Sequence, residues 1–565
     1  MGLHKQYLQV GRSAKNRLFG IPPSGKRTPA NGDTVSPIQM LISEQGKINH
    51  GRLAVIVVGV FTLVLGIILS TIPWADYIIL KHLRLWNGTI SYHYWQKPGV
   101  IRLTKVYVFN VTNPDGFLNN GEKPILVEVG PFVYREDMEK VNIKFHDNGT
   151  VTYQHNKILQ FVPEISADKS LKLTVPNIPL LTLSSHMNSI PRLAARALNI
   201  VLRVWKQKPF VHVTAQELMF GYDDPFTKIA SKVFPRGQRP NAKMGLLLTR
   251  NGTLDEVSTI YTGHTTMKEF GLINRLNGLD HLPYWPEAPC NSISASEGSF
   301  FPPRYFTGAD VVHVYDKDLC RVLPLRFTHM TAKDGIEAGY YVPPDDVFEA
   351  PDKKPDNRCF CPASDGSCPP RGLQNISPCQ YSAPVYLSFP HFYKADPSLL
   401  EAVVGLKPEK DKHETFFKIQ PKLGVPVEGE VRVQLNLRTE RSSASVVSNF
   451  PSITFPIIWL EEGVEELTPP IKRWIFLATT VADIAVPILN YGCIVAGLAV
   501  LAFMFVRTYK NVVFTKETLE RGKKTLRRGS SFIVNGQHRL LILRDSYTLL
   551  NNISTDPDPD PEAES

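Results

Sequence analysis

Two long apolar segments near the ends of the chain most constrain what it can fold into. The first, residues 53–72, is free of charged side chains, and as a helix it matches the thickness of a bilayer core. Lys47 and Arg52 precede it and Trp74 follows it, as is typical of a cytosolic flank and an interfacial aromatic residue. Because the polar stretch upstream is too long for a signal peptide, the segment predicts an uncleaved signal anchor. A buried core helix is the alternative interpretation.

The second apolar segment, residues 474–506, is longer than a bilayer requires and contains Asp483. A carboxylate at bilayer depth is costly, so we expect the span to begin after Asp483. Basic residues are concentrated beyond the segment, which predicts a cytosolic tail. The expected organisation is a cytosolic extension (1–52), a span (53–72), an ectodomain outside the cytosol (73–484), a second span (485–506) and a cytosolic tail (507–565), with both termini cytosolic.

Glycosylation sequons and cysteines fit this topology. Five Asn-x-Ser/Thr sequons lie between the spans, where they can be glycosylated: Asn87, Asn110, Asn148, Asn251 and Asn375. The sixth, at Asn552, lies in the tail and should stay unmodified.

Six of the seven cysteines also lie between the spans, and the seventh, Cys493, is expected in the second span as a packing residue or an acylation site. An even number in an oxidising compartment predicts three disulfides, with fifteen connectivities open. A zinc site is disfavoured because the chain has no Cys-x-x-Cys pair. We expect neither a metal nor another cofactor. The six cysteines are Cys290, Cys320, Cys359, Cys361, Cys368 and Cys379.

Composition and charge exclude two classes of protein. A mean hydropathy of −0.12 is too low for a polytopic transporter. The formal net charge is +10, but residues 1–52 alone contain eight basic and only two acidic side chains. The part between the ends therefore has no strong basic excess, and we expect no nucleic-acid partner.

The ectodomain sequence has the alternation of β-strands, which is clearest in residues 106–112, 125–134 and 431–437. Asn-Gly pairs between alternating arms predict two β-hairpins, over residues 141–155 and 243–261. Both turns contain a sequon.

A helical pattern interrupts these strands. Residues 187–208 predict an amphipathic helix with a basic stripe, and residues 214–221 predict a short helix with a capping box formed by Thr214 and Glu217. The stripe is either a solvated face or a surface that attracts anionic ligands. Its members are Arg192, Arg196, Arg203 and Lys206.

Several motifs, in order along some 400 residues, resemble those of the class B scavenger receptors, the family of platelet glycoprotein four and the lysosomal integral membrane protein. They include residues 110–114, 130–136, 217–226, 359–361, 389–393, 413–415 and 459–462. The resemblance implies an α+β ectodomain: an irregular antiparallel β-barrel with a membrane-distal helical bundle and a lipid-conducting tunnel. It also implies the disulfides Cys290–Cys359, Cys320–Cys379 and Cys361–Cys368.

The function expected from this resemblance is a receptor that binds lipid, lipoprotein-like or anionic ligands at its helical apex and passes lipid towards the membrane. Sterols, fatty acids and phospholipids are all candidate cargo, and the receptor could form homo-oligomers. The alternative is a sorting receptor that carries a soluble enzyme to lysosomes. A hydrolase is disfavoured because the chain lacks a Gly-x-Ser-x-Gly motif, and His413-Glu lacks the second histidine of a zinc motif. A channel is disfavoured because two spans offer little pore lining.

The tail contains a short sorting pattern. Asp545 followed by Leu549 and Leu550 fits the acidic dileucine signal, and Tyr547 to Leu550 also fits a tyrosine signal, which clathrin adaptors bind in extended form. We therefore expect the protein in late endosomes and lysosomes, with passage through the plasma membrane.

Overall fold

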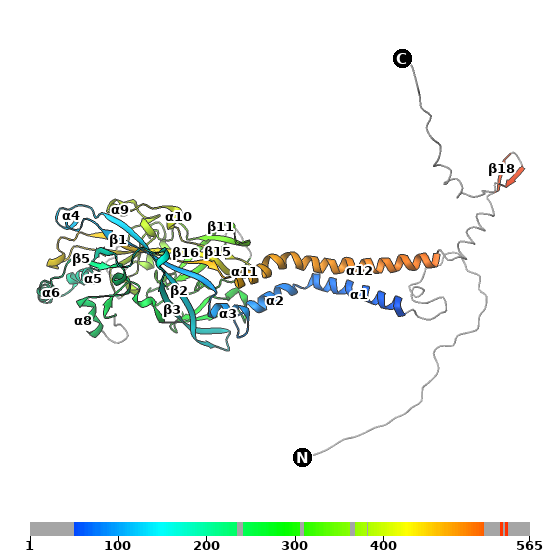
Figure 1. Cartoon of the computed structure of the whole chain (residues 1–565), viewed down its shortest axis with the longest axis horizontal. Coiled ribbons are helices and arrows are strands. Elements are labelled where there is room, and N and C mark those ends of the chain that lie inside the picture. The colour runs from blue at the N-terminus through cyan, green and yellow to red at the C-terminus, as the bar shows by residue number, and fades with distance from the viewer. Residues whose placement is uncertain are drawn as a thin grey trace, which may run out of the picture. The chain divides into compact units, whose positions relative to one another are not determined.

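The computed structural model describes residues 50–233, 241–304, 310–361, 368–380, 382–513, 531–534 and 537–540. The chain separates into two compact units (Figure 1). The terminal unit consists of Met1–Thr71 and Leu489–Ser565, and the central unit of Ile72–Ile488.

The terminal unit contains the two apolar segments as helices. Helix α1 (His50–Thr71) packs against the later part of α12 (Ala482–Val513) through glycines. A Cβ atom on Gly66 would lie 2.7 Å from the backbone nitrogen of Ile494, so only glycine permits this approach. Helices long and apolar enough to cross a membrane extend over His50–Thr71 and Pro469–Lys510. The unit also contains the strand pair β18 (Ser531–Val534) and β19 (Gln537–Leu540).

One antiparallel sheet of thirteen strands dominates the central unit, and its main path runs β10-β11-β12-β15-β16-β17-β1-β2-β3-β8-β9. The strands on this path are β1 (Val100–Val111), β2 (Leu126–Phe145), β3 (Thr150–Phe161), β8 (Gly252–Tyr261), β9 (Ile273–Leu276), β10 (Val311–Asp316), β11 (Arg321–Lys333), β12 (Ile336–Val342), β15 (Phe416–Gln420), β16 (Val425–Thr439) and β17 (Ile453–Leu467). Strand β14 (Val385–Ser388) pairs with β16 and with β13 (Gln374–Asn375).

The predicted mixture of helices and antiparallel strands is confirmed, but the described strands do not form a closed barrel. The outer strands β9 and β10 are not paired with each other. Instead, Ser296 forms isolated bridges with Leu272, beside β9, and with Val314 in β10. The described residues between these two strands contain no strand of their own, so the edges of the sheet are joined only at single residues.

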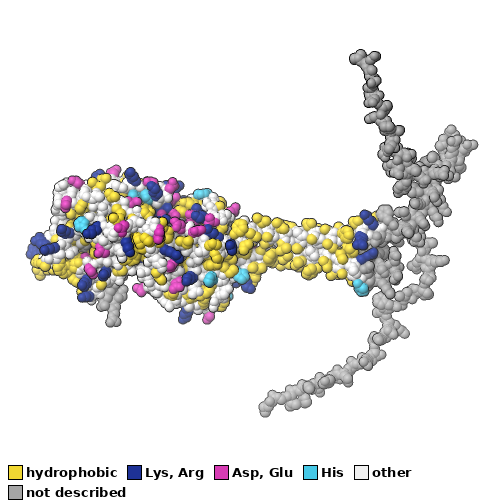
Figure 2. Space-filling model, viewed as in Figure 1, with side chains coloured by type: hydrophobic (Ala, Val, Ile, Leu, Met, Phe, Trp, Pro, Cys, Tyr) yellow, Lys and Arg dark blue, Asp and Glu magenta, His cyan; other side chains and the backbone are white. Residues whose placement is uncertain are grey.

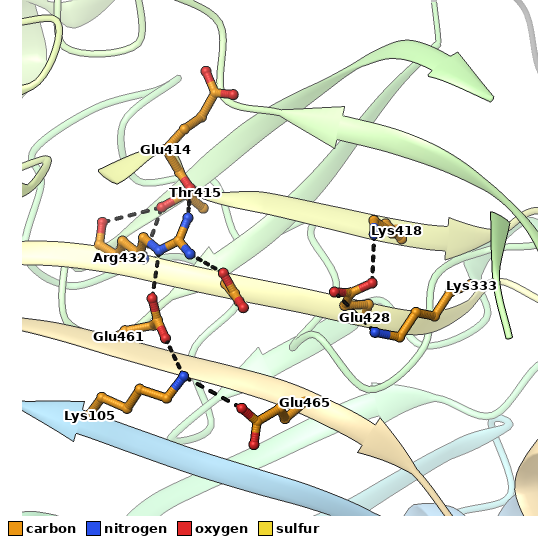
Figure 3. A network of polar contacts seen from close by, with 10 residues as sticks. Lys105, Lys333, Glu414, Thr415, Lys418, Glu428, Arg432, Glu461 and Glu465 are labelled. Carbon is orange, nitrogen blue, oxygen red and sulfur yellow. Dashed lines mark hydrogen bonds and ion pairs between the residues drawn. The ribbon is translucent and has the colours of Figure 1, made fainter. Parts of the chain in front are cut away.

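Successive side chains of the central strands point to opposite faces of the sheet, and the two faces differ in chemistry. In register, Glu461 of β17 lies between Arg432 of β16 and Lys105 of β1. These three side chains form ion pairs on one face (Figure 3). Their neighbours Val431 and Glu462, also paired in register, face the opposite side and line a cavity.

One of the two predicted hairpins is confirmed, and the other is wrong. Strands β2 and β3 pair around a turn at Gly149, as expected for residues 141–155. The residues before Asn251, however, do not pair with β8. The backbone nitrogen of Leu247 instead donates to Met219, and the side chain of Arg250 forms ion pairs with Asp318 and Glu462. Tertiary contacts therefore override the local turn signal.

The short helices near α6 lie at the end of the central unit opposite α2 (Trp74–Leu83), α3 (Ile90–Gln96) and α11 (Pro469–Phe476) (Figure 1). They are α5 (Ile178–His186), α6 (Arg192–Val204), α7 (Ala215–Phe220) and α8 (Pro225–Val233), beside the strand pairs β4 (Lys172–Pro176)–β5 (Phe210–Thr214) and β6 (Tyr222–Asp223)–β7 (Lys243–Met244). Three further short helices are α4 (Pro114–Asn119), α9 (Pro397–Glu401) and α10 (Lys410–His413).

The capping box at Thr214 and Glu217 forms as predicted, at the start of α7. The predicted single helix over residues 187–208 is shorter than expected. Pro191 precedes α6, and Lys206 lies beyond its end with a positive φ of 48°. Proline favours the beginning of a helix rather than its interior, which explains the late start.

The cysteines form the disulfides Cys290–Cys359, Cys320–Cys379 and Cys361–Cys368, the same pairs that the family resemblance implies. Cys290, Cys320 and Cys359 are buried in one of the two hydrophobic cores of the unit. Disulfides and packing therefore stabilise the same region.

Candidate functional site

A cavity of about 190 Å³ lies against one face of the large sheet. We call it the inner chamber. Ten strands contribute residues to it, which shows that the sheet curves around it. Three of them contribute alternate residues: His155 and Lys157 in β3, Leu254, Glu256 and Ser258 in β8, and Gly429, Val431 and Val433 in β16. The others include Arg102 in β1, Met138 in β2, Asp316 in β10 and Glu462 in β17.

Two cations of the chamber wall, Lys157 and Arg102, form ion pairs with the buried Glu136. Glu136 lies 3.1 Å from Lys157 and 3.6 Å from Arg102. Burial disfavours its ionised form, but the two cations outweigh burial and hold the pKa of Glu136 at about 2. The carboxylate therefore stays charged at any physiological pH.

Other wall groups are less fully compensated. Burial raises the pKa of Glu256, and burial together with the charge of Asp318 raises the pKa of Asp316 to about 6. Burial and the nearby charge of Lys157 lower the pKa of Lys317 to about 8. A wall of this kind favours water or a polar group over an alkyl chain.

A second cavity, of about 90 Å³, adjoins the inner chamber. We call it the apolar cavity. Helix α3 contributes Ser91, Tyr94 and Trp95, and Phe300, Val425, Leu467, Ile471 and Trp474 complete most of the wall. Six residues line both cavities: Arg102, Met138, Gly298, Ser299, Pro426 and Val464. Together the cavities offer an apolar surface next to a charged one, an arrangement that fits an amphiphilic molecule.

A fully buried lysine lies beside the two cavities. The Lys140 ammonium donates to Ser299 at 3.0 Å, lies 3.5 Å from Glu297 and sits 5.1 Å from the centre of the Trp95 ring. Glu297 also contacts His155 at 3.2 Å. No sequence pattern indicates this cluster. Alternating charged residues in a strand normally indicate its solvent face, whereas here they point inwards.

The basic stripe lies on α6 and just beyond it, with different environments for its members. Arg192 and Arg196 are exposed on the helix, and Lys206 is exposed after it. Arg203 is exposed too, but its guanidinium donates to Ser445 at 3.0 Å. The stripe is therefore partly a contact with residues 443–445 rather than a uniform binding surface.

The structure also exposes much of the apolar face of α6. Leu193, Ile200 and Val204 are 81%, 64% and 70% exposed. On α8, Ile229 and Val233 are exposed as well, and Trp205 after α6 contacts Phe226 of α8 with ring centres 5.5 Å apart. We call these residues, with Arg192 and Arg196, the apical patch. Figure 2 shows hydrophobic and basic side chains together at this end of the unit.

The five sequons differ in accessibility. Asn87, Asn148 and Asn251 are exposed, and Asn110 is partly buried. Asn375 is only 4% exposed. A glycan is bulky and requires the surface, so Asn375 is the least favourable of the five acceptors in this fold. The tail signal of Asp545, Tyr547, Leu549 and Leu550 lies outside the described residues.

Comparison with known proteins assigns the family. A profile of the CD36 family matches residues 57–508, which is most of the chain and includes both cavities and the apical patch. The chain belongs to the CD36 family of class B scavenger receptors. The resemblance seen in the sequence motifs is thereby confirmed.

The relatives of this CD36-family chain carry receptor and lysosomal names. Scavenger receptor class B member 1 of Rattus norvegicus is 34% identical over 68% of this chain and 75% of its own length. Lysosome membrane protein 2 of Mus musculus is 33% identical over 74% of this chain and 86% of its own length. Protein peste of Drosophila melanogaster is 31% identical over 73% of this chain and 75% of its own length.

Three of the family motifs meet in a polar cluster on the central unit. The rings of His391 and His413 stack with centres 4.4 Å apart, and both His391 and the Trp459 indole contact the carboxylate of Glu128. Burial and the adjacent His391 lower the pKa of His413 to about 4. His413 is therefore neutral near pH 7, and its ring packs against that of His391. This is a structural role, and it does not depend on a zinc motif.

Proposed function

We propose that the chain is a receptor that binds lipid or lipoprotein-type ligands at the apical patch and passes lipid through the two cavities towards the membrane. The observation that carries this proposal is the adjacency of the apolar cavity and the inner chamber, which share six wall residues. The walls of the apolar cavity stabilise an alkyl chain by about 0.8 kcal/mol for each buried methylene group, and the charged wall of the inner chamber accommodates the polar end of a lipid. Moving a lipid in this way requires no catalytic step.

The apical patch suits the surface of a lipid particle. Exposed Leu193, Ile200 and Val204 can enter an apolar surface layer, while Arg192 and Arg196 attract anionic headgroups. In this proposal the central unit lies outside the cytosol and both termini lie inside it. The receptor would act alone or as a homo-oligomer.

Two variants should separate docking from transfer. Arg192→Glu with Arg196→Glu should weaken binding to phosphatidylserine-containing vesicles at least about tenfold, since each basic residue near such a surface contributes about 1 kcal/mol. Met138→Trp should leave vesicle binding intact but reduce lipid uptake severalfold, because Met138 lines both cavities. Cells that express the full chain and take up vesicle-bound fluorescent lipid provide both measurements.

Met330→Trp is the matched control for the cavity variant, because Met330 is exposed on β11. Normal uptake by Met138→Trp would contradict transfer through the cavities. Normal vesicle binding by the double arginine variant would contradict docking at the apical patch.

The alternative function is a sorting receptor for a soluble luminal enzyme. The exposed apolar residues of the apical patch would also suit a protein ligand, and one relative is named lysosome membrane protein 2. Immobilised full-length protein incubated with either lipid particles or lysosomal hydrolases would distinguish the two. Retention of a hydrolase but not of lipid would favour the sorting role.

We further propose that the tail signal directs the protein to late endosomes and lysosomes through clathrin adaptors. Leu549→Ala with Leu550→Ala should shift most of the steady-state pool to the plasma membrane, because the adaptor pockets require both apolar side chains. Surface biotinylation measures this shift. Tyr547→Ala, which disrupts only the overlapping tyrosine signal, is the matched variant, and lysosomal residence of the dileucine variant at the wild-type level would contradict the proposal.

A further inference from the structure

A buried arginine without a carboxylate partner lies in the disulfide-bonded region of the central unit. Arg321 is 6% exposed and follows the disulfide-bonded Cys320 at the start of β11. Burial lowers the pKa of Arg321 to about 9, so its guanidinium is still charged at pH 7. Buried charges in proteins are normally paired, because an unpaired charge loses its hydration without compensation. The described residues therefore leave one buried positive charge uncompensated.

A second buried arginine of the same unit shows the usual arrangement. Arg432 is 7% exposed and forms ion pairs with Glu430 and Glu461. Arg321 instead uses one nitrogen, Nη1, to donate to two neutral oxygens, the side-chain oxygen of Gln374 at 2.7 Å and the Val347 carbonyl at 3.5 Å. These bonds satisfy part of its hydrogen-bonding capacity but do not neutralise its charge.

An aromatic ring and the disulfides hold the guanidinium in place. The Phe360 ring centre lies 3.8 Å from the Arg321 Cζ atom, a close cation–π contact. Phe360 itself lies between Cys359 and Cys361, and each of these cysteines forms a disulfide. Stacking occupies the flat face of a guanidinium, whereas its N–H groups point outwards in the plane. The remaining N–H groups of Arg321 are therefore still able to donate.

One of these groups is accessible from a small cavity that Arg321 lines, which we call the arginine cavity. Neither Nε nor Nη2 donates to a described residue. Nε is completely enclosed, but Nη2 keeps accessible surface, so a group in the cavity reaches the guanidinium at Nη2. The volume of about 20 Å³ suits one group of roughly the size of a water molecule and is too small for a lipid chain.

The remainder of the wall favours a negative occupant. Among the residues assigned to it, Glu349 is the other charged one, and its carboxylate lies 3.5 Å from Arg371 and accepts from the backbone nitrogen of Ala350 at 3.1 Å. Much of the wall is apolar, with Phe348 and Leu373 among its members. A charge-assisted hydrogen bond in such surroundings is stronger than one between neutral groups, so an anion gains more beside Arg321 than water does.

We propose that the arginine cavity is a binding site for a small inorganic anion, with chloride as its ligand. The anion accepts a hydrogen bond from Nη2 and neutralises the buried charge of Arg321. Its role is structural, because it stabilises the region that the three disulfides hold together. The arginine cavity shares no wall residue with the inner chamber or the apolar cavity, so this inference does not depend on the proposed lipid function.

The test is the thermal unfolding of the purified full-length protein in mixtures of potassium chloride and potassium gluconate at one ionic strength. Gluconate is too large for the cavity. Replacing gluconate with about 150 mM chloride should raise the Tm of the wild-type protein by about 1–3 °C, because a ligand that binds only the folded state stabilises it. Potassium bromide should have a similar effect. Arg321→Gln keeps a polar side chain but removes the charge, and its Tm should be the same in chloride and in gluconate.

Arg304→Gln is the matched control. Arg304 is a partly buried arginine of the same unit, but its charge is already compensated by Asp310 at 2.9 Å. Its variant should therefore keep the full chloride-dependent rise in Tm, whatever its own stability.

A second measurement needs no variant and decides the question if Arg321→Gln does not fold. Crystals of the wild-type protein grown in potassium bromide should give an anomalous bromine peak beside Nη2 of Arg321. Absence of that peak, equal Tm values of the wild-type protein in chloride and gluconate, or an equal rise in Arg321→Gln and wild type would each overturn the inference. The last result would indicate a general salt effect with water beside Arg321. Lipid uptake is measured separately, so failure here leaves the proposed function unaffected.

Discussion

Replacing Arg432 with methionine should destabilise the protein by about 3–5 kcal/mol, the usual effect of removing one partner of a buried ion pair. The Arg432 side chain is 8% exposed, donates to Glu461 at 2.8 Å and to the Glu414 carbonyl at 2.6 Å, and also contacts Glu430 (Figure 3). Without it, Glu430 and the Glu414 carbonyl lose their cationic partner inside the sheet. Chemical unfolding of the full-length protein measures the difference.

The control for this variant lies in the same sheet. Lys333 is one-third exposed and lies 3.5 Å from Glu428, which keeps a second partner in Lys418 at 2.6 Å (Figure 3). Lys333→Met should therefore cost less than about 1 kcal/mol. Equal losses for Lys333→Met and Arg432→Met would contradict the importance of the central network.

The second large effect concerns the disulfides. Cys320 and Cys379 are 59 residues apart, whereas Cys361 and Cys368 are 7 apart. A disulfide that closes a longer loop restricts the unfolded chain more, so losing the first bond should cost about 4 kcal/mol and losing the second about 2 kcal/mol. Paired Cys→Ser variants should show this order in unfolding experiments and in the fraction of protein that leaves the endoplasmic reticulum.

Peptide mapping under non-reducing conditions checks the pairing itself. A linked peptide containing Cys290 and Cys320 would contradict both the structure and the family resemblance. A larger loss of stability from the short-range disulfide than from the long-range one would contradict the loop argument.

Local features of the fold could be predicted because their causes are local. Residues 53–71 form part of a long helix because an uninterrupted apolar run has no other way to satisfy its backbone in a membrane. Thr214 begins α7 because its hydroxyl and Glu217 satisfy the free backbone groups of the first turn. The family could be identified for a similar reason, because its motifs and their order are properties of the sequence alone.

The lining of the candidate site could not be predicted. Alternation in β3 is visible in the sequence, but a period of two does not state which face is inside. His155 and Lys157 alternate with polar neighbours, and only pairing with β2 and β8 directs them into the inner chamber. The exposure of the apolar face of α6 could not be predicted either, because periodicity does not reveal that no other described element covers Leu193 or Ile200.

The sequence by itself determined the two apolar helices, the strands with clear alternation, the capped helix α7, the number of disulfides and the family. The tertiary structure decided the inner chamber, the apolar cavity and the exposed apolar residues of α6. The physical reason is the range of the interactions. Helix capping, apolar runs and turns depend on residues close in sequence, whereas a cavity forms from side chains that only strand register and packing bring together.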